Sequence, residues 1–360
     1  MTSARPSSYG IVGRIAVAGC GGFAAFYTFY TTASSALNES GISSGARVGI
    51  VMLVVVAVQP LLIIGRRWVR NRRVAVMLAL AAMGLGSAIL PLMNQWPGSL
   101  LLGLGFGVFV VMSTVWVKEQ AASGQTGRAL GTYGFGSAVG GALGAPIGLY
   151  AAELGGQLAV ALVGSAFALG ALVPAGQAKS STDNRSDLQL GSPSVELAAP
   201  DSLKRSRTFS TATIVITSLV GHLFAVSLYA AVLSSVGDTE GTWLPVLAAL
   251  MVQVCLALGR LVGGRLSDRY PPLAILVTAA GILALSTMVF SVVLSRLGIL
   301  LAVAVIGFTS GVGQTAALTA MMRRARTSRN TEMASAGWNI AFDAGLGIGA
   351  LAAGWAFSQG

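Results

Sequence analysis

Residues 259–269 read Gly259-Arg260-Leu261-Val262-Gly263-Gly264-Arg265-Leu266-Ser267-Asp268-Arg269, and they lead from one long apolar run toward the next. The two runs cover residues 243–264 and 273–294. Each reaches the roughly 20 mainly apolar residues that a helix needs to cross a bilayer. The connection between them is short and rich in arginine. It is therefore read as a tight loop between two transmembrane helices.

Apolar runs of this length recur along the whole chain. Hydrophobic residues make up 54% of the sequence and charged residues only 10%, whereas a typical soluble domain is about 25% charged. A soluble fold cannot hide so much apolar surface, so the sequence predicts an all-α membrane protein. Eleven transmembrane helices are expected, at residues 11–33, 46–65, 74–93, 98–117, 129–151, 157–176, 210–236, 243–264, 273–294, 297–321 and 332–357.

The basic residues predict the orientation of these helices. If the N-terminus is inside, the cytoplasmic segments carry 21 of the 23 lysines and arginines, and the outer loops carry only Arg47 and Arg296. This count places Arg260 with the cytoplasmic residues. Cytoplasmic loops are enriched in Lys and Arg, so the N-terminus is expected inside. The net charge of +11 then reflects membrane topology and not a nucleic-acid partner.

The chain divides into two halves that resemble each other. The predicted parts are a six-helix half at 1–176, a flexible cytoplasmic linker at 177–209, and a five-helix half at 210–360. Gly65 and Arg70, after the second span, match Gly264 and Arg269, after the eighth, at a constant offset. A duplicated helical unit of this kind is an architecture of secondary transporters.

The order of Gly264, Asp268 and Arg269 resembles the Gly-x-x-x-Asp-Arg signature loop of the major facilitator superfamily. The helix number, linker and repeat are similar to that superfamily as well. The resemblance implies a bundle of two pseudo-repeated helical halves, transport by alternating access, and a loop that locks neighbouring helices in one state. Gly264 allows two helix ends to approach, and Asp268 can cap the next helix or meet a basic neighbour. Arg269 can bridge to another helix end.

The chain departs from the superfamily pattern at three places. The N-terminal loop keeps Gly65 and Arg70 but has Val69 where the family has Asp, so its usual ion pair is in doubt and asymmetric gating is expected. The fourth span has no arginine before Gly103, which excludes a proton relay through that residue. The sequence ends after the eleventh span, so a twelfth helix is expected to be missing and its packing flank exposed.

The fifth predicted span carries a series of glycines. Gly131, Gly140, Gly144 and Pro146 resemble the Gly-x8-Gly-x3-Gly-Pro motif of drug–proton antiporters, with the proline displaced by one position. The resemblance favours export. Generic packing of small residues between helices explains the glycines as well, and Pro146 is expected to kink the helix.

Two ionisable residues are identified as candidates for proton coupling, His222 and Asp343. Both lie near the predicted bilayer midplane, where an unpaired charge costs about 2.5–3.5 kcal/mol or more. Such groups pair, face water or take a proton. The structural alternative for His222 is a hydrogen bond between helices. For Asp343 it is a pair with an amide or hydroxyl group, and Asn339, four residues earlier on the same helix, is a candidate.

In the superfamily fold, helices 1, 4, 7 and 10 line a central cavity. The candidate cavity residues here are Tyr27, Tyr30, Thr31, Met112, Trp116, His222, Tyr229 and Gln314, together with Asn339 of the last span. This aromatic and polar set suits an amphiphilic organic solute. Tyr27 and Tyr30 can equally be interfacial tyrosines at a helix end.

The sequence thus favours proton-coupled efflux of a small amphiphilic organic compound, with the proton gradient as energy source and no cofactor. An uptake permease of the same superfamily and a non-transporting scaffold or receptor remain alternatives. One histidine and no grouped carboxylates outside the linker argue against a membrane enzyme, and Cys20 and Cys255 offer no metal spacing. The expected partners are the lipid bilayer and the substrate, the expected state is a monomer, and the expected location is a bacterial inner membrane.

Overall fold

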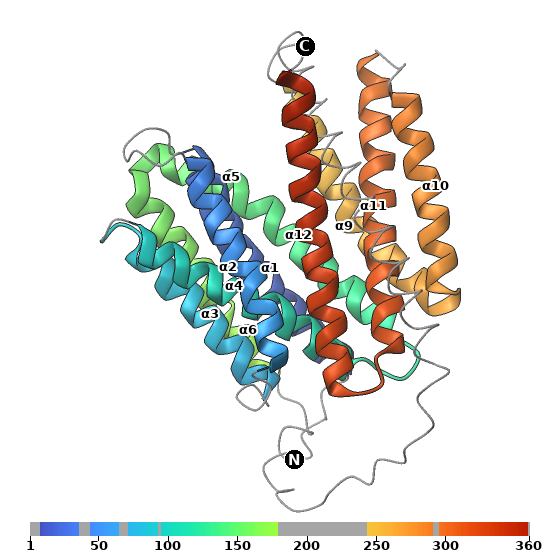
Figure 1. Cartoon of the computed structure of the whole chain (residues 1–360), viewed down its shortest axis with the longest axis horizontal. Helices are drawn as coiled ribbons and strands as arrows, with labels where there is room; N and C mark the ends of the chain where they lie inside the picture. The colour runs from blue at the N-terminus through green and yellow to red at the C-terminus, as the bar shows by residue number, and fades with distance from the viewer. Residues whose placement is uncertain are drawn as a thin grey trace, which may run out of the picture.

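The computed structural model describes residues 8–35, 44–64, 71–92, 95–178, 243–290 and 295–358, and every regular element in these ranges is an α-helix (Figure 1). The helices are α1 (Ser8–Ser35), α2 (Ser44–Ile64), α3 (Arg72–Ile89), α4 (Trp96–Gln120), α5 (Thr126–Gly170), α6 (Leu172–Gln177), α9 (Trp243–Arg269), α10 (Pro272–Phe290), α11 (Arg296–Arg324) and α12 (Ser328–Ser358). The predicted span 210–236 lies outside the described residues, so the count of eleven stays a prediction.

Helix α5 contains two of the predicted spans. Its backbone angles are helical except at Gly155 and Gly156, and Gly156 has a φ of 58°, a conformation that glycine adopts without steric cost. The chain reverses there, between the predicted spans 129–151 and 157–176 (Figure 1). Pro146 lies inside the first span, but the break from helical angles is at the glycine pair and not at the proline.

The first span of α5 packs against α1 through backbone contact. A Cβ atom added to Gly140 or Gly144 would overlap the carbonyl groups of Cys20 and Ala24 on α1. The hydroxyl of Thr28 donates to the carbonyl of Ala24 at 2.9 Å, within its own helix. Small residues therefore bring the two helices together, as association in lipid requires.

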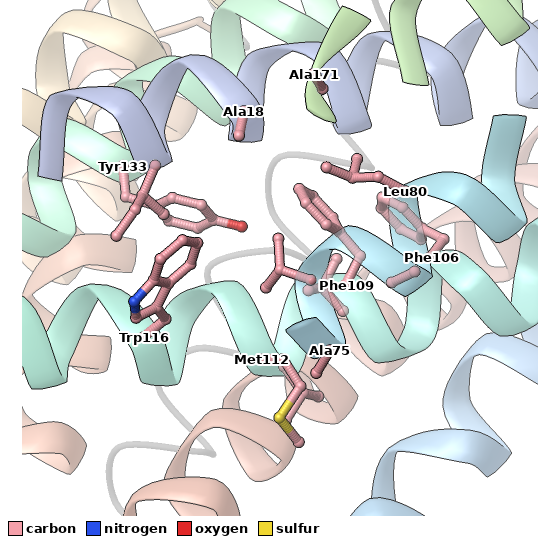
Figure 2. Packing of buried hydrophobic residues seen from close by; sticks show 14 of the residues in the cluster. Ala18, Ala75, Leu80, Phe106, Phe109, Met112, Trp116, Tyr133 and Ala171 are labelled. Atoms are coloured by element: carbon pink, nitrogen blue, oxygen red, sulfur yellow. The ribbon is translucent and has the colours of Figure 1, made fainter. Parts of the chain in front are cut away.

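Aromatic side chains of α4 fill the centre of the first half. Figure 2 shows Phe106, Phe109 and Trp116 between α4 and the helices that cover it, with the ring of Tyr133 beside the indole. Phe106 stacks on Phe26 of α1 at a centroid distance of 3.7 Å. The same buried cluster continues into the second half through residues of α11 and α12, Leu318, Met322, Ala334 and Ala336.

The helices form two groups that meet at one end and diverge toward the other (Figure 1). Helices α1 to α6 make one group, and α9 to α12 make the other. The end at which they meet carries Lys118, Arg128, Arg269 and Arg324. Among the described residues, six helical segments are long and apolar enough to cross a membrane, of which Thr126–Gln177 contains the reversal in α5.

Candidate transport site and gates

Asp268, at the end of α9, ties the second half to the first. Its carboxylate accepts hydrogen bonds from the backbone N–H groups of Gly127 and Arg128, each at 2.8 Å. Arg323 of α11 donates to the same carboxylate at 2.8 Å. Asp268 thus both caps a helix N-terminus, where a negative charge is favourable, and meets a basic neighbour. The sequence suggested that Asp268 caps the next helix in the chain. The helix that it caps in the structure is instead α5 of the other half.

Glycines next to this carboxylate bring α5 and α9 into backbone contact. A Cβ added to Gly131 would lie 2.6 Å from the carbonyl oxygen of Arg260 and 3.0 Å from the Cα of Gly264. A Cβ on Gly127 would lie 2.5 Å from the carbonyl oxygen of Gly264. Gly264 therefore allows the close approach that its position predicted. The side chain of Arg269 is exposed and forms no hydrogen bond with any residue that the structure describes.

A second set of charges joins the halves at the same end. Arg72, at the start of α3, forms ion pairs with Glu332 of α12 and, at 3.3 Å, with Glu119 of α4. It also donates to the hydroxyl of Ser328 at 3.0 Å. The loop that contains Gly65, Val69 and Arg70 lies outside the described residues, but Arg72 supplies an ion pair between the halves nearby. Sequence reasoning had counted Arg72 only as a topological charge and had overlooked Glu332 at the start of the last span.

Lys118 reinforces the same contact from α4. Its ammonium group donates to the backbone carbonyl of Ala325 and, at 2.9 Å, to the hydroxyl of Thr331. Both acceptors belong to the second half. Together with Arg72, this lysine closes the basic end of the molecule.

Arg260 is buried in the bundle, which corrects its place among the cytoplasmic charges. Only 9% of the residue is exposed. Its guanidinium donates to the side chain of Gln314 on α11 at 2.7 and 3.2 Å, and to the carbonyl of Gly134 at 3.0 Å and the hydroxyl of Ser137 at 2.8 Å on α5. It lies eight residues before Asp268 on α9, about 12 Å along a helix. That spacing was a signal in the sequence that Arg260, like His222 and Asp343, lies deep within a span.

Asp343, on α12, contacts the first half through Gln59 of α2. The side-chain amide of Gln59 donates to its carboxylate at 3.5 Å, the long limit of a hydrogen bond. Gln59 is fully buried, and it was not recognised from the sequence, although it is a polar residue in an apolar run. Asn339 is not the partner of Asp343, because its amide donates to the carbonyl of Ser335 at 2.9 Å, one turn back along the helix.

Three predicted cavity residues lie together on α1. The rings of Tyr27 and Tyr30 are 5.9 Å apart between centroids, and both phenol groups lie within electrostatic range of the Asp343 carboxylate. The hydroxyl of Thr31 donates to the backbone carbonyl of Tyr27 at 2.8 Å. The polar face of α1 therefore lies within electrostatic range of the candidate coupling residue of α12, across the two halves.

The other predicted cavity residues are more deeply packed or lie outside the description. Met112 and Trp116 are at most 1% exposed and belong to the main buried cluster (Figure 2). Gln314 is buried against Arg260. His222 and Tyr229 lie outside the described residues. The roles of all these residues in a substrate cavity stay predictions.

The described residues contain no group of three or more His, Cys, Asp or Glu side chains placed to hold a metal ion.

Comparison with known proteins identifies the class to which this arrangement belongs. The family profile of the Major Facilitator Superfamily matches residues 15–350. The chain therefore belongs to the Major Facilitator Superfamily, a family of multi-pass membrane transporters and not of enzymes. No curated protein matches the chain.

Solved structures of the superfamily share its fold. The transporter FucP in the outward conformation is similar with a TM-score of 0.69 and 12% identity, over 97% of this chain and 92% of that chain. A variant of the E. coli fucose:proton symporter FucP is similar with a TM-score of 0.67 and 11% identity, over 98% of this chain and 92% of that chain. At such identities the likeness concerns the fold alone.

Proposed function

We propose that this chain is a proton-coupled secondary transporter that exports a small amphiphilic organic compound across a bacterial inner membrane. The observation that carries the proposal is Asp343, a carboxyl group that contacts Gln59 of the opposite half and neighbours Tyr27 and Tyr30. A titratable group between the two moving halves is placed to exchange a proton whenever access alternates. Ionisable residues within membrane spans are functional candidates for this reason.

The contacts between the halves support alternating access. Asp268, Arg72 and Lys118 all tie the halves together at the basic end. With the basic end in the cytoplasm, as the sequence predicts, this arrangement is an outward-facing state. Opening toward the cytoplasm would then break these polar contacts together, and the substrate and the proton would supply the differential binding energy that the change requires.

The bond between Gln59 and Asp343 suggests how a proton can act on this equilibrium. When Asp343 is ionised, the amide of Gln59 donates to a charged acceptor, and protonation of Asp343 weakens that interaction because the acceptor loses its charge. One cross-half contact therefore depends on the protonation of one residue. His222 remains a second candidate for coupling.

The test is compound-evoked proton flux in proteoliposomes that contain a trapped pH-sensitive dye, with protein-free liposomes subtracted. We expect the wild-type protein to move protons when a transported compound is added. Asp343→Asn keeps the shape and polarity of the side chain but cannot titrate, so it should fold and lose at least about 90% of the coupled flux. Asn339→Asp restores a carboxyl group one turn away and serves as a positional control in the Asp343→Asn background.

Normal flux from Asp343→Asn at every pH would show that the carboxylate is structural. Absence of flux with every compound from the wild-type protein would instead favour a non-transporting scaffold or receptor.

The direction of transport is a separate question with two candidate answers. The glycines of α5 resemble an antiporter motif and favour export, whereas FucP, which shares the fold, is a fucose:proton symporter. Inside-out vesicles that are acidified internally distinguish the two. An antiporter accumulates its substrate in such vesicles, and a symporter expels it.

A further inference from the structure

A buried arginine lies between the two halves and has no acidic partner among the residues that the structure describes. Arg260 is 9% exposed, and its four hydrogen bonds all go to neutral oxygens, those of Gln314, Gly134 and Ser137. Arg260 forms no ion pair with a residue that the structure describes, in contrast to Arg72 and Arg323.

A buried charge of this kind destabilises the protein unless an interaction compensates for it. A charged side chain inside a membrane span is unfavourable by about 2.5–3.5 kcal/mol or more, and it normally pairs with an opposite charge or with backbone carbonyls, or faces a water-filled cavity. A structural tie among α5, α9 and α11 needs only a neutral donor, such as glutamine or asparagine. The guanidinium keeps its charge at physiological pH, so this position is one that suits an anionic ligand.

The surroundings of Arg260 suit a carboxylate attached to an apolar body. Gln314 holds one edge of the guanidinium through both Nε and Nη2, which fixes the direction of its planar fork. Tyr27 of α1 lies within electrostatic range of both Arg260 and Asp343. The rings of Phe26 and Tyr30 stand next to Tyr27, each with its centroid 5.9 Å away. Aromatic surface therefore adjoins the charge.

We propose that Arg260 binds the anionic group of the substrate, so that the transported compound is an amphiphilic organic anion, for which a carboxylate is the fitting group. The inference deepens the proposed transport function and rests on it. A carboxylate forms charge-assisted, bidentate bonds with a guanidinium that are about twice as strong as neutral ones. It therefore displaces the neutral oxygens of Gly134 and Ser137. Because Arg260 and Gln314 both belong to the second half, the fork remains oriented when α5 moves away.

The test is thermal stabilisation of the purified full-length protein in lipid nanodiscs by three probes of similar size: benzoate, the neutral benzamide and the cationic benzylamine. We expect benzoate, at about 100 times its Kd, to raise the Tm by roughly 3–8 °C. Benzamide and benzylamine should leave the Tm unchanged. The binding measurement needs no proton gradient, so its outcome is independent of whether Asp343 couples transport.

Three variants assign the effect to the guanidinium. Arg260→Gln should abolish the benzoate shift, and Arg260→Lys should retain part of it. Gln314→Glu places an internal carboxylate against Arg260. It should therefore abolish the benzoate shift without lowering the Tm of the unliganded protein. This variant keeps the proposal testable if Arg260→Gln fails to fold. Arg265→Gln, on the exposed side of the same helix, is the matched control and should behave as wild type.

Equal stabilisation by the three probes, a full benzoate shift in Gln314→Glu, or no shift with benzoate, phenylacetate or succinate would overturn the proposal. Loss of the benzoate shift in Arg260→Gln together with unchanged proton coupling in Asp343→Asn would support the anion site and contradict the proposed coupling residue.

Discussion

Buried charges in this protein have two kinds of environment. Arg72 is compensated by the carboxylates of Glu332 and Glu119, whereas Arg260 meets only neutral oxygens within the described part of the chain. The first arrangement balances charge within the protein and is suited to holding the halves together. The second arrangement leaves the positive charge of Arg260 without a counter-charge among the described residues and is suited to binding an anionic ligand. The difference lies in the partners and not in the residue type, since both are arginines at helix positions.

The pair of Arg72 and Glu332 is expected to show strong energetic coupling. Removal of one partner leaves a buried charge uncompensated, which typically costs about 3–5 kcal/mol. Arg72→Met and Glu332→Leu should each lower the Tm, and the double variant should lower it by less than the two changes combined. A double-mutant cycle of thermal unfolding in nanodiscs measures the coupling, for which we expect about 1–3 kcal/mol. Additive effects would show that the pair contributes no net interaction.

Different parts of helix α5 pack against helices of the two halves. Gly127 and Gly131 lie against α9 of the second half, and Gly140 and Gly144 lie against α1 of the first. The glycines that resemble an antiporter motif therefore do not all pack against the same helix in this conformation. One contacts the interface between the halves, and two fix the internal packing of the first half.

Gly140→Ala should destabilise the first half. The added methyl group would overlap the backbone carbonyl of Cys20, which cannot move without shifting α1. Overpacking of this kind costs about 1–3 kcal/mol, and the gain in helix propensity of up to about 1 kcal/mol offsets only part of it. Gly170→Ala is the matched control on the same helix, because no atom lies within 4 Å of its added Cβ. Thermal unfolding that is equal for both variants would contradict the packing argument.

The molecule as a whole is asymmetric from end to end. Its basic end is closed by Asp268, Arg72, Lys118 and their partners across the halves, while the helix groups diverge toward the other end (Figure 1). If the basic end lies in the cytoplasm, two exposed turns of the first half lie on opposite sides of the membrane. Ser123 precedes α5 at the basic end, and Gln157 follows the glycine pair at the other end.

Cysteine labelling of intact cells tests this orientation. In a background without Cys20 and Cys255, we expect Gln157→Cys to react with a membrane-impermeant maleimide and Ser123→Cys to react only after the cells are permeabilised. The two sites are similarly exposed turns of the same half, so each controls for the reactivity of the other. The reverse pattern would invert the topology and make the described state inward-facing.

The sequence was sufficient to predict the membrane class, most helix positions and the superfamily. A span requires only a local run of apolar residues, and the boundary between residues 151 and 157 coincides with the reversal at Gly155 and Gly156. The signature loop is similarly local, and Asp268 meets a basic neighbour as expected, although the helix that it caps is α5 of the other half and not the next helix in the chain. These features depend on residue type and spacing along the chain, which are read without knowledge of the neighbours.

Only the tertiary structure identifies the partners of the polar residues. Gln59 and not Asn339 contacts Asp343, Arg72 meets Glu332, and Arg260 is buried between α5 and α11. A helix that is apolar on nearly all sides carries no signal for which face meets which neighbour, because lipid and protein interior are equally apolar. Partner choice then depends on how each helix is rotated and how closely glycines allow it to approach the next. Those quantities arise from packing of segments up to hundreds of residues apart.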